Sequence, residues 1–521
     1  MQRRSDLTAW VLLLATAFVP AVAAADNDPG AGQWKMIVLS GPTDVPVPPP
    51  AQVGSFDYQG ELNAIKEAQA RLTREQRRVV AYWSRGAVLR WNEIMLELVA
   101  NSDLPPAPRP DGTYPAPDPN NPFADPQFPF ANPPYAARAY SYVAVAQFEA
   151  LKAAWYYKYL YNRPSPAAVD RSVQPLRPVI DLPAYPSEDA VVAGVSVELL
   201  KLLFPTKADA ITRKANEQQE AAWLAGRAAG SDLAAGFTLG REVARIFAAR
   251  AASDGMRTAA GSPAAWAAMA ADAEARGEIP WKSMEDPPRP PMLPLFGRVR
   301  AWMMTPDDIV NERPGPPPST SSALMERELA EVRATVDNAT RKQMAIAYKW
   351  ADGASTPTPP GHWNFIAHPY ISAAGYSEVR AARAFALLNM AMHDAAVGCW
   401  DAKFTYFNPR PAQLDPGIRT LVGLPNFPSY TSGHSTFSAA AAEVLSYLFA
   451  NDRSYFEQER DEAAISRLYC GIHYRSDIEV GVRHGVRIGG YTLRFARTDG
   501  ADGPFSTSVP MEQLKAPGGG S

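Results

Sequence analysis

An internal repeat sets the architecture that this sequence can adopt. A shift of 245 positions aligns two long stretches without a gap, and upstream a shift of 267 positions continues the match. The aligned stretches are residues 136–158 with 381–403, 182–204 with 427–449, and 61–83 with 328–350. A repeat of this length indicates two units with the same fold. We therefore divide the 521 residues into a first copy at 60–255 and a second copy at 328–500.

Both copies have the pattern of helices. Alanine-rich stretches with apolar residues at helical spacing recur, and Pro- and Gly-containing segments separate them. The clearest of these stretches are residues 136–155, 190–204, 381–400 and 435–450. No alternating pattern of a length useful for strands occurs. The sequence predicts an all-α fold of two tandem helical bundles packed together.

Segments outside the two copies have different compositions. The chain contains 50 prolines, about twice the usual share, and many of them gather in extended runs that we interpret as linkers or wrapping loops. The predicted segments are a signal peptide at 1–25, a Pro-rich N-terminal segment at 26–59, a Pro-rich linker at 256–327 and a C-terminal tail at 501–521.

The first 25 residues resemble an export signal. Arg3 and Arg4 form a basic start, an apolar stretch runs over residues 10–22, and small residues suitable for cleavage follow. No other run approaches the ~20 apolar residues that a membrane span needs. We therefore expect a mature protein without a membrane span that is periplasmic or secreted.

Charge and cysteine content exclude some classes of function. The net charge of −3 gives no electrostatic reason to expect a nucleic-acid partner. Only Cys399 and Cys470 occur, so the chain is not a disulfide scaffold. Both cysteines lie beside motifs that must converge, and the sequence leaves open whether they form a bridge or are two buried thiols.

Three clusters in the second copy together form a candidate oxyanion site. Three cations, a hydroxyl, a glycine amide and two imidazoles can surround one tetrahedral or bipyramidal oxyanion. The clusters are Lys403 with Arg410, then Ser432, Gly433 and His434, and then Arg467, His473 and Asp477. Each cluster alone is a weak signal, but their combination in this order is specific.

The spacing of the third cluster suggests individual roles. His473 and Asp477 are four residues apart and share a helix face, so the carboxylate can fix the tautomer of the imidazole. The other ring nitrogen of His473 can then attack phosphorus or coordinate vanadium. His434 is the candidate general acid/base. The oxyanion-binding candidates are Lys403, Arg410, Ser432, Gly433 and Arg467.

The first copy lacks this chemistry. Glu188 and Asp189 stand opposite Gly433 and His434, and alanines stand opposite Arg467 and His473. We therefore predict a scaffolding role for the first copy and an active site in the second. We expect residues kept in both copies, such as Trp400 opposite Trp155, to be structural.

Three further histidines carry weaker expectations. We expect His393 and His484 to serve packing or to lie on the surface, because apolar residues occupy their positions in the first copy. His362 lies in an insertion found only in the second copy, TPTPPGHW, and could reach the pocket rim.

The motifs resemble those of type 2 phosphatidic acid phosphatases, bacterial class A acid phosphatases and vanadium-dependent haloperoxidases. The shared pattern stands here as KFTYFNPRP, PSYTSGH and SRLYCGIHYRSD, with Thr431 where the family usually has proline. The sequence around these motifs resembles that of the secreted bacterial haloperoxidase-like branch. The resemblance implies that His473 is the axial vanadium ligand or the phosphoryl acceptor. It also implies that Trp400 and Phe427 lie near the halide.

The resemblance leaves two chemistries open. The favoured one is a vanadate-dependent haloperoxidase that uses hydrogen peroxide to oxidise halide, with vanadate as the cofactor. The alternative is a soluble acid phosphatase that hydrolyses phosphate monoesters through a phosphohistidine intermediate and needs no cofactor. A non-enzymatic oxyanion-binding protein is a third and weaker hypothesis. The expected partners are small molecules, and the chain could form a homodimer.

Overall fold

The computed structural model describes residues 27–114 and 129–501, and no strand occurs among them. The predicted all-α fold class is confirmed. The signal peptide at 1–25 and most of the tail at 501–521 lie outside the described residues. The helices of the first half are α1 (Phe56–Ala70), α2 (Arg74–Trp83), α3 (Ala87–Ser102), α4 (Pro133–Tyr161), α5 (Pro166–Val169), α6 (Glu188–Leu203), α7 (Ala208–Leu224) and α8 (Gly230–Ala252).

The second half contains helices in the same order and of nearly the same lengths. They are α11 (Ala323–Asp337), α12 (Arg341–Lys349), α13 (Thr358–Ala373), α14 (Glu378–Tyr406), α15 (Pro411–Leu414), α16 (Gly433–Leu448), α17 (Arg453–Tyr469) and α18 (Arg475–Ala496). The first helix of each series begins upstream of the predicted copy, at Phe56 rather than 60 and at Ala323 rather than 328. The segment between the series, predicted as a linker, contains α9 (Pro263–Ala275), the 3-10 turn η5 (Phe296–Arg298) and α10 (Pro306–Glu312).

Matching local signals start matching helices in the two halves. The hydroxyl of Thr73 accepts from the backbone N–H of Gln76 before α2, and Thr340 does the same with Gln343 before α12. In both cases the glutamine side chain also reaches back to the N-cap, which completes a capping box. Ser187 and Ser432 cap α6 and α16 in turn. The sequence therefore fixes equivalent helix starts in both halves.

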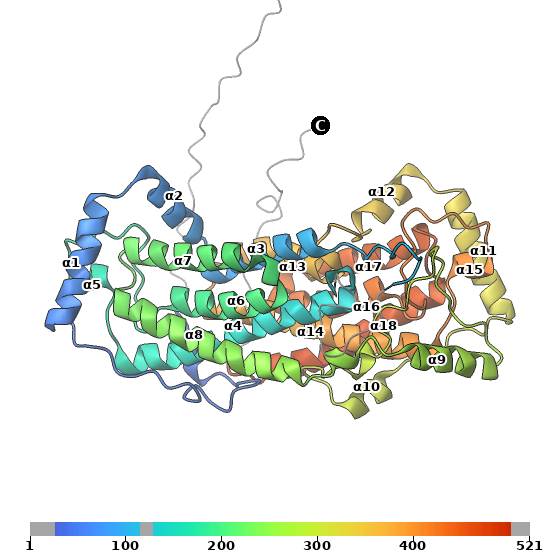
Figure 1. The fold of residues 1–521 in the computed structure, drawn as a ribbon, viewed down its shortest axis with the longest axis horizontal. Coiled ribbons are helices and arrows are strands. Elements are labelled where there is room, and N and C mark those ends of the chain that lie inside the picture. Colours follow the sequence, from blue (N-terminus) through green and yellow to red (C-terminus); the bar gives the residue numbers. More distant parts are fainter. Residues whose placement is uncertain (1–26, 115–128, 502–521) are drawn as a thin grey trace, which may run out of the picture.

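Each half packs as a four-helix bundle. In the first half α6 contacts α4, α7 and α8, and in the second half α16 contacts α14, α17 and α18. The two bundles meet where the long helices α4 and α14 pack against each other, near the centre of an elongated molecule (Figure 1). Helices α1 and α11 lie at its opposite ends (Figure 1). In the described residues no helix has both the length and the apolar character that a membrane crossing requires.

Close contact between α16 and α18 places the N-terminus of α18 beside the loop that precedes α16. A Cβ added to Gly485 would lie 2.2 Å from the Thr436 carbonyl oxygen, so only glycine permits this approach. At one end of this helix contact, the N–H of Ser432 donates a hydrogen bond to the backbone carbonyl of Asp477, at 3.0 Å. The helix packing therefore brings the second and third motif clusters together.

Candidate active site

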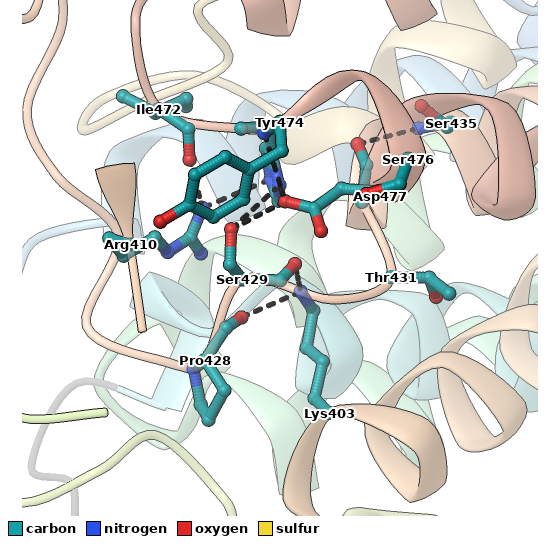
Figure 2. A network of polar contacts seen from close by, with 12 residues as sticks. Lys403, Arg410, Pro428, Ser429, Thr431, Ser435, Ile472, Tyr474, Ser476 and Asp477 are labelled. Atoms are coloured by element: carbon teal, nitrogen blue, oxygen red, sulfur yellow. Dashed lines mark hydrogen bonds and ion pairs between the residues drawn. The ribbon is translucent and has the colours of Figure 1, made fainter. Parts of the chain in front are cut away.

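All three motif clusters converge beside the N-terminus of α16. Lys403 lies near the end of α14, Arg410 lies in the loop after it, and Arg467 lies near the end of α17. His473 lies in the turn between α17 and α18, and Asp477 lies in the first turn of α18. Figure 2 shows the core of this arrangement, in which Ser429 lies between Lys403 and Asp477.

The imidazole of His473 is held from both sides. Its Nδ1 lies 2.9 Å from Asp477 Oδ2, and its Nε2 lies 3.0 Å from Arg410 Nη1. Ser429 donates a further hydrogen bond of 2.5 Å to Asp477 Oδ2. Burial, followed by the charge of Arg410, keeps the pKa of His473 well below its usual value. We assign the ring as neutral, with its proton on Nδ1 and the lone pair of Nε2 turned towards the cations.

The carboxyl group of Asp477 is equally buried. Burial raises its pKa to about 6, against the hydrogen bond from Ser429 and the charges of Lys403 and Arg410. The backbone N–H of Tyr474 also donates to Oδ2, at 3.1 Å. The carboxyl is thus ionised at neutral pH and accepts three hydrogen bonds on one oxygen, which fixes its orientation against His473.

Three buried cations surround the imidazole with too little negative charge to balance them. Lys403 Nζ donates to the carbonyls of Pro428 and Ser429, both at 2.8 Å, and burial lowers its pKa to about 7. Burial also lowers the pKa of Arg410 to about 10 and that of Arg467 below its usual value. Arg410 Nη2 is buried and has no hydrogen-bond partner among the described residues. An oxyanion would supply both the missing acceptor and the missing charge.

Ser432 and Gly433 form the start of α16. The Ser432 hydroxyl accepts from the backbone N–H of Ser435 at 3.3 Å, so it serves as the helix cap. A Cβ added to Gly433 would meet only Phe437 and Trp400, at 3.7 and 3.9 Å. The glycine leaves this space free beside the first N–H groups of a 16-residue helix, which is a favourable place for an anion.

His434, the predicted acid/base, lies against a carboxylate that the sequence analysis did not single out. Its Nε2 is 3.3 Å from Asp352 Oδ2. The other oxygen of the same carboxylate, Oδ1, lies 3.0 Å from His362 Nδ1. Burial, followed by Arg467, lowers the pKa of His434 to about 4, while Asp352 opposes both. For Asp352 itself, burial favours the neutral acid, but the two histidines outweigh burial and lower its pKa.

The site opens onto a cavity of about 550 Å³. Gly433, His434, Arg467 and His473 contribute its polar wall, and Trp400 and Phe427 belong to its apolar wall. The two aromatic rings contact each other at 4.9 Å between centroids, and Trp400 Nε1 donates to the Met292 carbonyl at 3.0 Å. Both predicted pocket aromatics therefore face the space beside the motif residues.

The remaining histidines and the cysteines lie apart from this chemistry. His362 stacks on Trp350 at 4.2 Å and is not part of the cavity wall, so it reaches the site only through Asp352. His393 and His484 are fully buried, as packing residues are. The thiols of Cys399 and Cys470 are both free and buried, so the bridge that the sequence left open does not form.

In the first copy, carboxylates of the chain pair with the buried cations. Glu188 pairs with Lys158 at 2.7 Å and also with Arg227, while Asp189 pairs with Arg177 at 3.3 Å. Lys158 and Glu188 are the counterparts of Lys403 and Gly433. The cations that would bind an oxyanion are thus satisfied by side chains of the chain itself.

Asp352 and Ser429 are two site residues that were not predicted from the sequence. Asp352 stands opposite Arg85 under the shift of 267 positions, and Ser429 stands opposite Ala184 under the shift of 245. The comparison of the two copies carries a signal for both residues, because each polar side chain replaces a residue of different chemistry. Their partners become evident only in the folded chain, where Asp352 meets two histidines and Ser429 meets Asp477.

Comparison with known proteins gives one family and one fold. Residues 383–500 match the model of the PAP2 superfamily. No curated protein was found to match the chain. The structure is similar to that of the first bacterial vanadium-dependent iodoperoxidase, with 22% sequence identity and a TM-score of 0.55, over 78% of this chain and 96% of that one. This likeness shows a shared fold.

Two further solved structures are more distant. They are the holo and apo forms of a bacterial vanadium-dependent chloroperoxidase, each 13% identical over 70% of this chain. The similarity covers 92% and 94% of those chains, with TM-scores of 0.48 and 0.49.

Proposed function

Residues 383–500 belong to the PAP2 superfamily, and from this premise we propose that the protein is a vanadate-dependent haloperoxidase. One observation carries the proposal. Three buried cations and a neutral histidine with an inward-facing lone pair surround a point where Arg410 Nη2 has no acceptor. A tetrahedral or bipyramidal oxyanion supplies what that arrangement lacks. The structural likeness to an iodoperoxidase over most of both chains favours vanadate as that oxyanion.

The chain's own residues suit vanadate. Lys403, Arg410 and Arg467 would neutralise the charge on its oxygens. The backbone N–H groups at the N-terminus of α16, at Gly433, would bind an oxygen, and His473 Nε2 would bind the group through its lone pair. When bound, the group would supply the activation of hydrogen peroxide for halide oxidation. Asp477 keeps the proton on Nδ1 of His473 and so keeps Nε2 available.

His434 would handle protons at the edge of the cavity. In the protein as described its pKa is about 4, because burial and Arg467 disfavour the imidazolium. A bound anion beside it would raise that pKa towards neutrality, where a general acid/base is most effective. Trp400 and Phe427 would exclude water from the space where a halide approaches.

An acid phosphatase is the second candidate, and the same His473–Asp477 pair favours it. A neutral imidazole whose Nε2 carries a lone pair, here turned towards Arg410, is also a nucleophile for a phosphoryl group, and His434 could protonate a leaving alcohol. The cavity of about 550 Å³ offers room for that alcohol. This activity would need no cofactor.

A paired assay separates the two activities. The purified mature protein is tested for bromination of a phenolic dye with hydrogen peroxide and bromide, and for hydrolysis of p-nitrophenyl phosphate, with and without orthovanadate. We expect bromination that vanadate activates and that His473→Ala abolishes. Phosphate hydrolysis that vanadate inhibits, without any bromination, would refute the haloperoxidase and support the phosphatase.

We also propose that the mature protein is periplasmic or secreted, on the basis of its N-terminal sequence. Cell fractionation of the producing organism, with immunodetection of the chain, checks this. Detection of the full-length chain in the cytoplasm alone would contradict the proposal.

A further inference from the structure

The cavity beside the motif residues is larger than one oxyanion fills. Its volume of about 550 Å³ falls in the usual range for small organic ligands. Its wall away from the cations is mainly apolar and comes from the first half, the linker and the second half of the chain. Representative residues are Pro105, Pro133, Met292, Tyr348, Leu424 and Ile472. Such a wall excludes water and favours an apolar occupant.

A polar spot formed by Asn426 and the linker lies within this wall. Asn426 is only 3% exposed, and its Nδ2 donates to the carbonyls of Arg289 and Pro290, at 3.3 and 2.5 Å. The N–H of Met292 donates to the Asn426 carbonyl at 3.0 Å, so the linker and this loop are held together. Asn426 Oδ1 is buried and has no hydrogen-bond partner among the described residues.

The neighbouring arginine leaves a donor unused. Arg289 donates from Nη2 to Glu285 Oε1 at 2.8 Å, while its Nε is buried and likewise unpartnered in the described part of the chain. Asn426, Arg289 and Glu285 all line the cavity. Glu285 balances the charge of Arg289, so the spot offers one donor and one acceptor without favouring an anion.

We propose that this cavity binds an uncharged, mainly apolar organic molecule through a hydroxyl or amide group that accepts from Arg289 Nε and donates to Asn426 Oδ1. Each buried group left unpaired destabilises the protein, and a complementary ligand recovers that loss. The inference rests on the proposed function, because the occupant is either the organic acceptor of the oxidised halogen or the alcohol part of a phosphate ester. Both sources share the same chemistry.

Calorimetric titration of the full mature chain tests the site without any turnover. The probes are 2-naphthol and 2-methoxynaphthalene, which share an apolar body but differ in the hydroxyl donor. No peroxide, halide or vanadate is present, so a failed haloperoxidase assay leaves the result unaffected. We expect 2-naphthol to bind about tenfold more tightly, as one hydrogen bond to a buried partner allows.

Two variants locate the preference. Asn426→Ala removes Oδ1, the acceptor of the hydroxyl proton, and should bring the two affinities within about twofold of each other. Arg289→Lys keeps the positive charge but removes Nε, and it should weaken both probes and keep the preference, because each probe has an oxygen that accepts from Nε. Arg298→Lys, at an exposed arginine outside this cavity, is the control and should keep the tenfold preference. Equal binding of both probes to the unmodified chain, no binding at all, a preference that survives Asn426→Ala, or unchanged affinities in Arg289→Lys would overturn the proposal.

A second arm distinguishes the two sources of the ligand. If the occupant is a separate acceptor, saturating orthovanadate leaves 2-naphthol bound. If the occupant is the alcohol part of an ester, 2-naphthyl phosphate binds at least about tenfold more tightly than 2-naphthol. Orthovanadate then displaces the 2-naphthyl phosphate. Either result supports the cavity as the organic site and assigns its occupant.

Discussion

At the scale of single residues, the properties of the site depend on the protonation states that burial and neighbouring charges give to its two histidines. His473 is neutral because it is buried among cations, and Asp477 decides which of its nitrogens carries the proton. His434 is held neutral in the same way, but Asp352 works against the lowering of its pKa. Different carboxylates therefore tune the two histidines, and the proposed function uses one to bind an anion and the other to exchange protons.

Replacing Asp352 should change the titration of His434 in a defined direction. Asp352→Asn removes the carboxylate that stabilises the imidazolium, so the pKa of His434 should fall further below about 4, by about one unit or more. Arg467→Gln removes a destabilising cation and should raise it. NMR titration of the imidazole resonances, assigned with His434→Ala, measures both shifts. An unchanged or raised pKa in Asp352→Asn would contradict the role given to this carboxylate.

Single residues also show which parts of the candidate site could be predicted from the sequence. The three clusters could be predicted because their residue types and spacing are specific, and the structure brings them together. Asp352 and Ser429 could not be assigned roles in the same way, because their partners are distant in the sequence and no local pattern indicates that a histidine or an aspartate contacts them. The two thiols were undecided for a similar reason: proximity of motifs does not fix the geometry that a disulfide needs.

At the scale of helices, the contact between α16 and α18 positions the catalytic cluster. It depends on glycine at the crossing, since α18 approaches the Thr436 carbonyl too closely for any side chain at Gly485. Gly240 has the same role in the first half, where an added Cβ would lie 2.2 Å from the Val191 carbonyl oxygen. The helices themselves could be predicted from alanine-rich periodicity and caps, but not the tightness of this crossing.

A pair of glycine substitutions on one helix tests that crossing. Gly485→Ala should destabilise the protein by about 1–3 kcal/mol, because the new methyl group clashes with backbone. Gly490→Ala is the matched control, since its nearest neighbour is the far end of Arg494 at 3.9 Å, and it should stabilise α18 by up to about 1 kcal/mol. Urea unfolding measures both changes. Equal effects of the two substitutions would show that the crossing is not tightly packed.

At the scale of the whole molecule, the two halves share one architecture but balance the charges of their buried cations in different ways. In the second half three buried cations surround the place of the proposed anion, whereas in the first half Glu188 pairs with both Lys158 and Arg227. The equivalent helices suggest that the first half supports the second mainly through the contact between α4 and α14. The repeat and the different residues at equivalent positions can be read from the sequence, but not which ion pairs form in the first half.

The internal ion pairs of the first half predict a pH-dependent stability. Glu188→Gln should cost about 3–5 kcal/mol at neutral pH, because it leaves Lys158 buried without its carboxylate. Lys158 and Arg227 overcome the effect of burial and lower the pKa of Glu188 from 4.5 to about 2. A lowered folded-state pKa stabilises above 4.5, so the gap between the two proteins should close as the pH falls towards 2.

The matched control for this prediction lies on the same helix. Glu198 pairs with Arg241 at 2.5 Å, but its side chain is 26% exposed and that of Arg241 is 40% exposed. Glu198→Gln should therefore cost less than about 1 kcal/mol at any pH. Equal losses for the two variants in urea unfolding would contradict the buried-pair account.

The stoichiometry of orthovanadate binding tests the central claim most directly. Equilibrium dialysis of the purified chain should find one bound orthovanadate per chain, although the fold contains two similar bundles. His473→Ala and Arg410→Ala should lose that binding, and Glu188→Gln, in the other bundle, should keep it. No binding, two equivalents per chain, or binding that survives both substitutions in the second bundle would contradict an oxyanion site confined to the second half.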